Sequence, residues 1–122
     1  MAGTSPTQRT LQRLRDDDWT AQVVEKWNPF AKIRQDLFGF VDVFAVRDDG
    51  RALLVQATSG SNHAARRVKL LANKNLRTCL LADLEVEVWS WAKQGPRGKR
   101  KTWQLRREAI TLADLEETND GQ

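Results

Sequence analysis

The chain has 122 residues, of which 40% are hydrophobic and 30% are charged, and its formal net charge is +4. This length suits one domain with one hydrophobic core, and the even spread of apolar residues argues against a disordered chain. The sequence has no apolar run near the about 20 residues of a membrane helix, and too few cysteines and histidines for a disulfide or a zinc site. We expect no signal peptide, because residues 1–6 are small and polar. We therefore expect one cytoplasmic domain over residues 1–122, with disordered tails at 1–6 and 118–122 and no membrane contact.

The N-terminal part predicts a helix and then a strand. Residues 7–15 place Leu11 and Leu14 at helical spacing. Residues 19–27 alternate between apolar and polar side chains, which is typical of a strand. The charged residues 32–38 are expected to form an irregular connection.

The middle of the chain predicts a hairpin and a basic helix. Apolar strands are expected at 38–46 and 52–58, because Asp48-Asp49-Gly50 between them is typical of a hairpin turn. Apolar residues then recur at helical spacing over 64–72, and 76–81 predicts a further short helix.

The C-terminal part predicts a second hairpin, with strands at 84–91 and 102–110 around the turn at 94–98. The order is therefore helix, three strands, helix, strand, strand. We expect an α/β domain with a mixed central β-sheet and flanking helices.

The aromatic residues and the single histidine are expected to have structural roles. Three tryptophans fit the inward faces of strands: Trp19, Trp27 and Trp103. For Trp89 and Trp91, packing in the core or between subunits is favoured over stacking on bases or a partner. Cys79 is expected to be buried and His63 to lie at the surface.

Positive charge is concentrated in two stretches without acidic residues. Residues 60–82 contain five basic side chains and residues 93–107 contain seven. Such stretches indicate a polyanionic partner, which we expect to be DNA, although a solvated charged face is the alternative. The residues expected to contact nucleic acid are Arg34, Ser59, Arg66, Arg67, Lys69, Lys99, Arg100 and Lys101.

Two polar residues interrupt the apolar strands of the first hairpin. Asp42 and Gln56 each lie seven residues from Asp49, so they are nearly opposite and can share one face. A buried carboxylate is costly unless it is paired or binds a cation. The pair therefore predicts either a cation site or a single buried Asp–Gln hydrogen bond.

These motifs resemble the PD-(D/E)XK nuclease superfamily, and they are most similar to the small archaeal Holliday-junction resolvases. "RLRDDDWTAQVV" (13–24) is similar to their basic helix and first strand, and "GFVDVFAV" (39–46) to their aspartate strand. "LLVQATS" (53–59) stands where they have Glu-x-Lys. The similarity covers about residues 7–71 and extends more loosely to the second hairpin. It implies a restriction-endonuclease-like core and a homodimer that cleaves DNA, with branched or junction DNA as a candidate substrate.

The resemblance also implies roles for individual residues. Asp42 matches the metal-binding aspartate and Gln56 the next ligand, so both are implied to bind Mg²⁺ or Mn²⁺. Thr58 stands where the family has the lysine that positions or deprotonates the attacking water. The family's first-helix glutamate falls near Thr7 or Gln8, and neither is acidic.

Other residues are candidates for the missing groups. Asp36 is expected to replace the helix acid, with a turn or cap aspartate as the alternative. Glu25 is a further candidate, but ordinary charge on a strand surface is favoured for it. The missing cation is expected among Lys32, Arg34, Arg66 and Lys69, with Lys32 or Lys69 as the base.

The leading prediction is a metal-dependent DNA endonuclease whose catalytic site contains Asp42, Gln56, Thr58, Asp36 and Lys32. One alternative is a nucleic-acid-binding protein that kept the fold without the chemistry. Another is a small interaction subunit that uses Trp89, Trp91 and the last hairpin as its contact surface.

Overall fold

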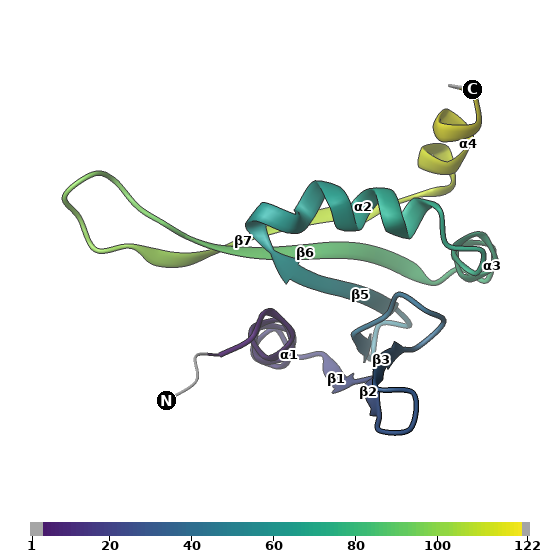
Figure 1. The fold of residues 1–122 in the computed structure, drawn as a ribbon, viewed down its shortest axis with the longest axis horizontal. Helices are drawn as coiled ribbons and strands as arrows, with labels where there is room; N and C mark the ends of the chain where they lie inside the picture. Colours follow the sequence, from purple (N-terminus) through teal and green to yellow (C-terminus); the bar gives the residue numbers. More distant parts are fainter. Residues whose placement is uncertain (1–3, 121–122) are drawn as a thin grey trace.

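The order of strands in the main sheet follows from two hairpins and one crossover (Figure 1). A computed structural model describes residues 4–120. Its elements are α1 (Pro6–Asp16), β1 (Thr20–Val23), β2 (Glu25–Asn28), β3 (Ile33–Asp36), β4 (Val43–Val46), β5 (Ala52–Ser59), the 3-10 helix η1 (Gly60–Asn62), α2 (His63–Leu71), α3 (Leu76–Leu81), β6 (Glu85–Gln94), β7 (Thr102–Ile110) and α4 (Leu112–Asp120). Five strands form one sheet in the order β1-β4-β5-β6-β7, while β2 and β3 pair separately. Only β5 and β6 are parallel, and α2 and α3 supply the crossover that a parallel pair requires. The predicted α/β class with a mixed sheet is confirmed.

Helices cover both faces of the sheet, with α1 on one side and α2 on the other (Figure 1). Leu11 and Leu14 of α1 pack with Leu53 and Val55 of β5 in one core. Leu54, between those two residues, points to the opposite core under α2 and α3. The alternation of β5 therefore places consecutive side chains in two different layers, because side chains of a strand point alternately to its two faces.

The prediction of a single strand over 19–27 is wrong. The strand is divided at Val24, whose backbone N–H donates to the carbonyl of Asp42 at 2.8 Å. After that bond the chain leaves the main sheet, and β2 pairs with β3 instead. The stretch 32–38, which was expected to be irregular, therefore contains a strand.

The strand expected over 38–46 begins only at Val43. Phe38 and Gly39 have φ values of 57° and 84°, in the left-handed region, and they form a turn that is incompatible with a strand. This turn directs Asp42 toward the end of the sheet beside the β2–β3 hairpin.

Within the described residues, the first and last elements of the chain are the helices α1 and α4. Pro6 begins α1, where proline is favoured because its missing N–H has no partner in the first turn, and the backbone N–H of Gln8 donates to the Ser5 side chain. Of the expected tails 1–6 and 118–122, residues 1–3 and 121–122 lie outside the described part. Between residues 4 and 120, no helix is long and apolar enough to cross a membrane.

Burial of the tryptophans only partly follows the prediction. Trp19, Trp89 and Trp91 are buried, as expected, and so is Cys79. Two tryptophans expected in or beside the core are instead exposed: Trp27 and Trp103. Trp27 belongs to the small β2–β3 sheet, and Trp103 lies in the part of the β6–β7 hairpin that extends past the end of β5, so neither has a core beside it.

Candidate functional site

A polar cavity of about 390 Å³ lies where the β2–β3 hairpin meets the main sheet. Thr7 of α1 and Ala57 of β5 form part of its wall. The rest of its lining is acidic and amide side chains on one side and basic side chains on the other. Some of the site residues predicted from the sequence line this cavity.

Three carboxylates meet in the cavity. One oxygen each of Glu25, Asp36 and Asp42 lies within 4.8 Å of the others. The register of the hairpin pairs Glu25 directly with Asp36, and the bond from Val24 to Asp42 holds β2 next to the third carboxylate. Carboxylates this close repel one another, and this repulsion favours the protonated form of Asp36 and Asp42.

Asp42 is the most buried of the three, with 6% of its surface exposed. Burial raises its pKa to about 8; the hydrogen bond from the Ala57 backbone N–H at 2.8 Å opposes this shift, and Asp36 and Glu25 add to it. Burial, and then the neighbouring Glu25, also raise the pKa of Asp36. Without a bound cation, Asp42 therefore keeps its proton near neutral pH.

Gln56 faces the same cavity, as the hairpin spacing predicted. Val43, the first residue of β4, pairs with Val55, so Asp42, immediately before β4, lies opposite Gln56. Gln56 is 4% exposed, and its Oε1 atom is buried without a hydrogen-bond partner, as is Oδ1 of Asp36. Unpartnered buried oxygens beside carboxylates fit a hard divalent cation such as Mg²⁺ or Mn²⁺, which prefers oxygen ligands.

The basic side of the cavity comes from two elements. Arg66 and Lys69 are three residues apart on α2 and therefore lie on one side of the helix. Arg34 of β3 also lines the cavity, and its guanidinium lies 2.9 Å from a carboxylate oxygen of Glu25. An acidic centre with a basic rim suits a cation and an anionic ligand together, such as a phosphate group.

The residues predicted from sequence thus divide into two groups. The cavity brings together Asp36, Asp42, Gln56, Arg34, Arg66 and Lys69. The residues that do not line it are Lys32, Thr58, Ser59, Arg67, Lys99, Arg100 and Lys101. Lys32 is exposed in the turn between β2 and β3, and Thr58 is buried opposite Ser90 of β6.

Glu25 is the residue that the sequence reasoning set aside. Ordinary surface charge was favoured for it, but its side chain is only 14% exposed and lies with the other two acids. The feature of the sequence that indicates this position of Glu25 is the Asn28-Pro29 turn. The Asn28 side chain accepts hydrogen bonds from the backbone N–H groups of Phe30 and Ala31, and this turn brings Glu25 beside Asp36.

The expectation of a surface histidine is also wrong, since His63 is 2% exposed. Its Nδ1 lies 2.7 Å from the hydroxyl of Ser90, and its Nε2 lies 2.9 Å from a carboxylate oxygen of Glu108. Arg67 donates to the other oxygen of Glu108 at 2.6 Å. This network connects the first turn of α2 to β6 and β7.

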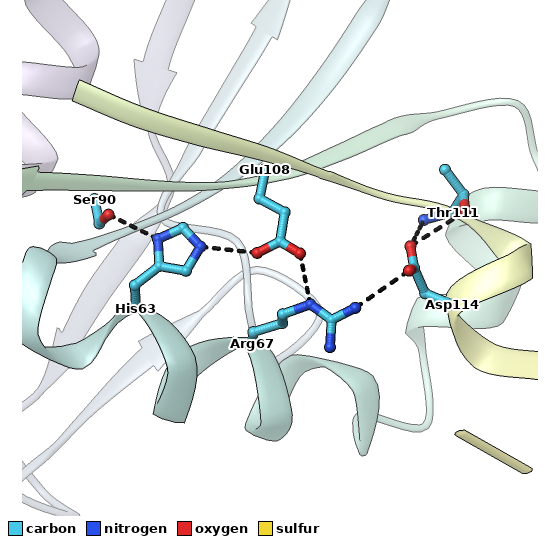
Figure 2. Close-up of polar contacts among 6 residues, drawn as sticks. All are labelled: His63, Arg67, Ser90, Glu108, Thr111 and Asp114. Atoms are coloured by element: carbon cyan, nitrogen blue, oxygen red, sulfur yellow. Dashed lines mark hydrogen bonds and ion pairs between the residues drawn. The ribbon is translucent and has the colours of Figure 1, made fainter. Parts of the chain in front are cut away.

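Arg67 also reaches Asp114 of α4 at 3.2 Å (Figure 2). It is therefore engaged on the side of α2 that faces β7 and α4, although it was expected to contact nucleic acid. Arg66 and Lys69 line the cavity from the same helix. The network thus holds in place the helix that supplies the basic side of the cavity.

Comparison of the chain with protein-family models, with curated proteins and with solved structures found no match.

Proposed function

We propose that this protein is a metal-dependent nuclease of the PD-(D/E)XK type that hydrolyses phosphodiester bonds in DNA. One observation carries the proposal. A single cavity combines three carboxylates within 4.8 Å of one another, the unpartnered buried oxygen of Gln56, and the basic side chains of Arg66 and Lys69.

The topology supports a restriction-endonuclease-like core. The resemblance implies the order helix, three strands, helix, strand, strand. The main sheet follows it with α1, then β1, β4 and β5, then the helical crossover, β6 and β7, while the β2–β3 hairpin is inserted between β1 and β4. Asp42, immediately before β4, lies opposite Gln56 in β5. Thr7, at the position of the family's helix glutamate, lines the cavity, and Glu25 supplies a carboxylate there instead.

The residues present fit a divalent cation. Asp42, Gln56, Asp36 and Glu25 would hold Mg²⁺ or Mn²⁺ through oxygen atoms. Such an ion, when bound, stabilises negative charge on phosphate oxygens and lowers the pKa of bound water. Arg66 attracts and orients the phosphate by charge-assisted hydrogen bonds. Lys69 is the cavity residue that we assign to the role of the lysine missing at position 58.

The basic turn of the β6–β7 hairpin is a second DNA contact in this proposal. Lys99, Arg100 and Lys101 are exposed there, beyond the residues that pair with β5. Figure 1 shows this hairpin extending away from the rest of the molecule. Contacts of this kind add affinity that decreases as salt increases, because each neutralised phosphate releases counterions.

The binding-only function is a second candidate, because Thr58 leaves the usual lysine position without charge. The interaction-subunit alternative has less support. Trp89 and Trp91, which were to form its contact surface, are buried in the core with α1. The proposal also includes a homodimer in the cytoplasm, and sedimentation velocity would test its subunit number.

The test is cleavage of single-stranded, duplex and four-way-junction DNA with Mg²⁺, with Mn²⁺ and with EDTA. Asp42→Asn should abolish cleavage and leave DNA binding in EDTA unchanged, since the Asp42 carboxyl, with a pKa of about 8, already carries a proton near neutral pH. Asp83→Asn, an exposed acid outside the cavity, is the matched control.

Equal cleavage by wild type and Asp42→Asn would exclude this cavity as the active site. Binding without cleavage across all substrates and both metals would favour the binding-only function.

A further inference from the structure

We propose that Trp27 stacks on an unpaired base of the strand whose phosphate enters the cavity. The substrates would then be DNAs with single-stranded or unpaired nucleotides at the bond to be cut. The inference depends on the proposed nuclease function and specifies its substrate class.

The register of the β2–β3 hairpin places Trp27 beside the cavity. Glu25 pairs with Asp36, and Trp27 pairs with Arg34. Residues two apart on a strand, and residues directly opposite on paired strands, point to the same face, so these four side chains lie on one face of the hairpin. Glu25, Arg34 and Asp36 all line the cavity. Trp27 is the fourth residue of this face, about 6.6 Å along the strand from Glu25 at the usual strand rise.

Trp27 is open to solvent, with 55% of its surface exposed. Covering this ring with a flat apolar partner would remove apolar surface from water and so favour binding. Bases stack on aromatic side chains regardless of sequence, because every base has a π-face.

The charges beside Trp27 decide between a nucleotide and an apolar protein partner. Arg34, directly across the hairpin from Trp27, lies 2.9 Å from Glu25 at the cavity. Arg66 and Lys69 line the cavity as well. A partner that covers Trp27 thus meets several cations and an acidic centre suited to a metal ion, and a nucleotide supplies both the ring and the phosphate.

The base has to be unpaired for this contact to form. In an intact duplex each base is stacked on its neighbours, and taking it out of the stack costs a few kcal/mol. That cost is lowest where the base is already single-stranded or lies at a mismatch or junction. Trp27 therefore favours single strands, flaps and branch points over continuous duplex.

The experiment measures affinity by fluorescence anisotropy, with Ca²⁺ replacing Mg²⁺ and with a labelled oligothymidine and a labelled blunt-ended duplex without unpaired bases as probes. Trp27→Ala should weaken oligothymidine binding by about 5- to 150-fold, which corresponds to the loss of one stacked base. Its duplex affinity should not change, and Trp27→Tyr should restore most of the single-strand affinity.

Ile33→Ala is the matched control. Ile33 lies in the same hairpin with a similar exposure of 51%, but it pairs with Asn28 and therefore points to the other face. It should bind both probes like wild type, and thermal melting of every variant verifies folding.

Unchanged oligothymidine binding by Trp27→Ala, or equal losses on both probes, would overturn the stacking inference and leave the nuclease proposal standing. A wild-type protein that neither binds nor cleaves any of these DNAs would overturn both.

Discussion

At the scale of single residues, the cavity keeps Asp42 in an environment that disfavours its charge. Burial raises its pKa to about 8, and the neighbouring carboxyl groups of Asp36 and Glu25 act in the same direction. The free protein therefore stores unfavourable electrostatic energy at this point whenever the pH exceeds that pKa. A bound cation would relieve it, so metal binding and proton release are coupled.

The first prediction concerns stability and pH in EDTA. The pKa of Asp42 is higher in the folded protein than its ordinary 3.8. Its contribution to stability is therefore fully present below about pH 4 and is lost as pH rises to about 8. Asp42→Asn should lack this loss of stability with rising pH. At pH 8 its free energy of unfolding should exceed that of wild type by at least about 1 kcal/mol, since each pKa unit corresponds to about 1.4 kcal/mol.

Urea unfolding of both proteins at pH 5 and pH 8 measures this difference, and Asp83→Asn is again the control. Adding Mg²⁺ at pH 8 should stabilise wild type more than Asp42→Asn. A wild-type stability that increases between pH 5 and pH 8 relative to Asp42→Asn would contradict the assignment.

The second prediction distinguishes two lysines that the sequence left equal. Lys69 lines the cavity and Lys32 does not. Lys69→Ala should lower the rate of single-turnover cleavage by about 10²-fold, the scale for loss of a proton-transfer group, while DNA affinity changes little. Lys32→Ala should cleave like wild type. A slow Lys32→Ala with a normal Lys69→Ala would reverse the assignment.

At the scale of elements, α2 performs two tasks at once. The side chains of His63 and Arg67 connect it to β6, β7 and α4 through Ser90, Glu108 and Asp114. Arg66 and Lys69 of the same helix line the cavity. Since a short helix gains most of its stability from packing, loosening these contacts should shift both basic side chains.

The third prediction tests this anchor. His63→Ala removes a buried ring whose nitrogens contact Ser90 and Glu108, and it should lower the free energy of unfolding by about 2 kcal/mol. Val68→Ala, an exposed residue on the same helix, should change it by less than about 0.5 kcal/mol. Urea unfolding measures both variants. Equal stability of His63→Ala and Val68→Ala would show that the network does not hold the helix.

The same network gives α2 an acid-sensitive contact. Burial raises the pKa of Glu108, but hydrogen bonds from His63 and Arg67 outweigh it and hold the pKa below its ordinary 4.5. A carboxyl group whose pKa is lowered by folding stabilises the folded protein when the pH is above its pKa in the unfolded chain. It loses this contribution as the pH falls below about 4.5. Glu108→Gln should therefore lose less stability than wild type between pH 5 and pH 3.

At the scale of the whole molecule, local patterns predicted the elements whose partners lie nearby in sequence. The turn at 48–50 indicated the β4–β5 hairpin, and this placed Asp42 opposite Gln56 correctly. The short, charged strands β2 and β3 have no apolar alternation, so their pairing depends on the Asn28-Pro29 turn rather than on a core. Glu25 was undervalued for this reason.

Burial of individual polar and aromatic residues was harder to predict, because it depends on distant partners. His63 is buried by groups 27 and 45 residues further along the chain. Trp27 is exposed because its strand leaves the main sheet, which no property of residues 19–27 indicates by itself. Local periodicity describes an element, while the position of that element in the fold decides what its side chains meet.

The shape of the β6–β7 hairpin also has a consequence for proteolysis. The turn between Gln94 and Thr102 contains four exposed sites at which trypsin cuts, after Arg97, Lys99, Arg100 and Lys101. Exposed turns are preferred sites of cleavage, so brief digestion should cut the chain there first. Nine residue pairs join β6 to β7, and Ile110 is buried in the core, so the two fragments should stay associated after the cut. The chain should then behave as a two-part protein, in which separately produced fragments ending and beginning in this turn assemble when mixed.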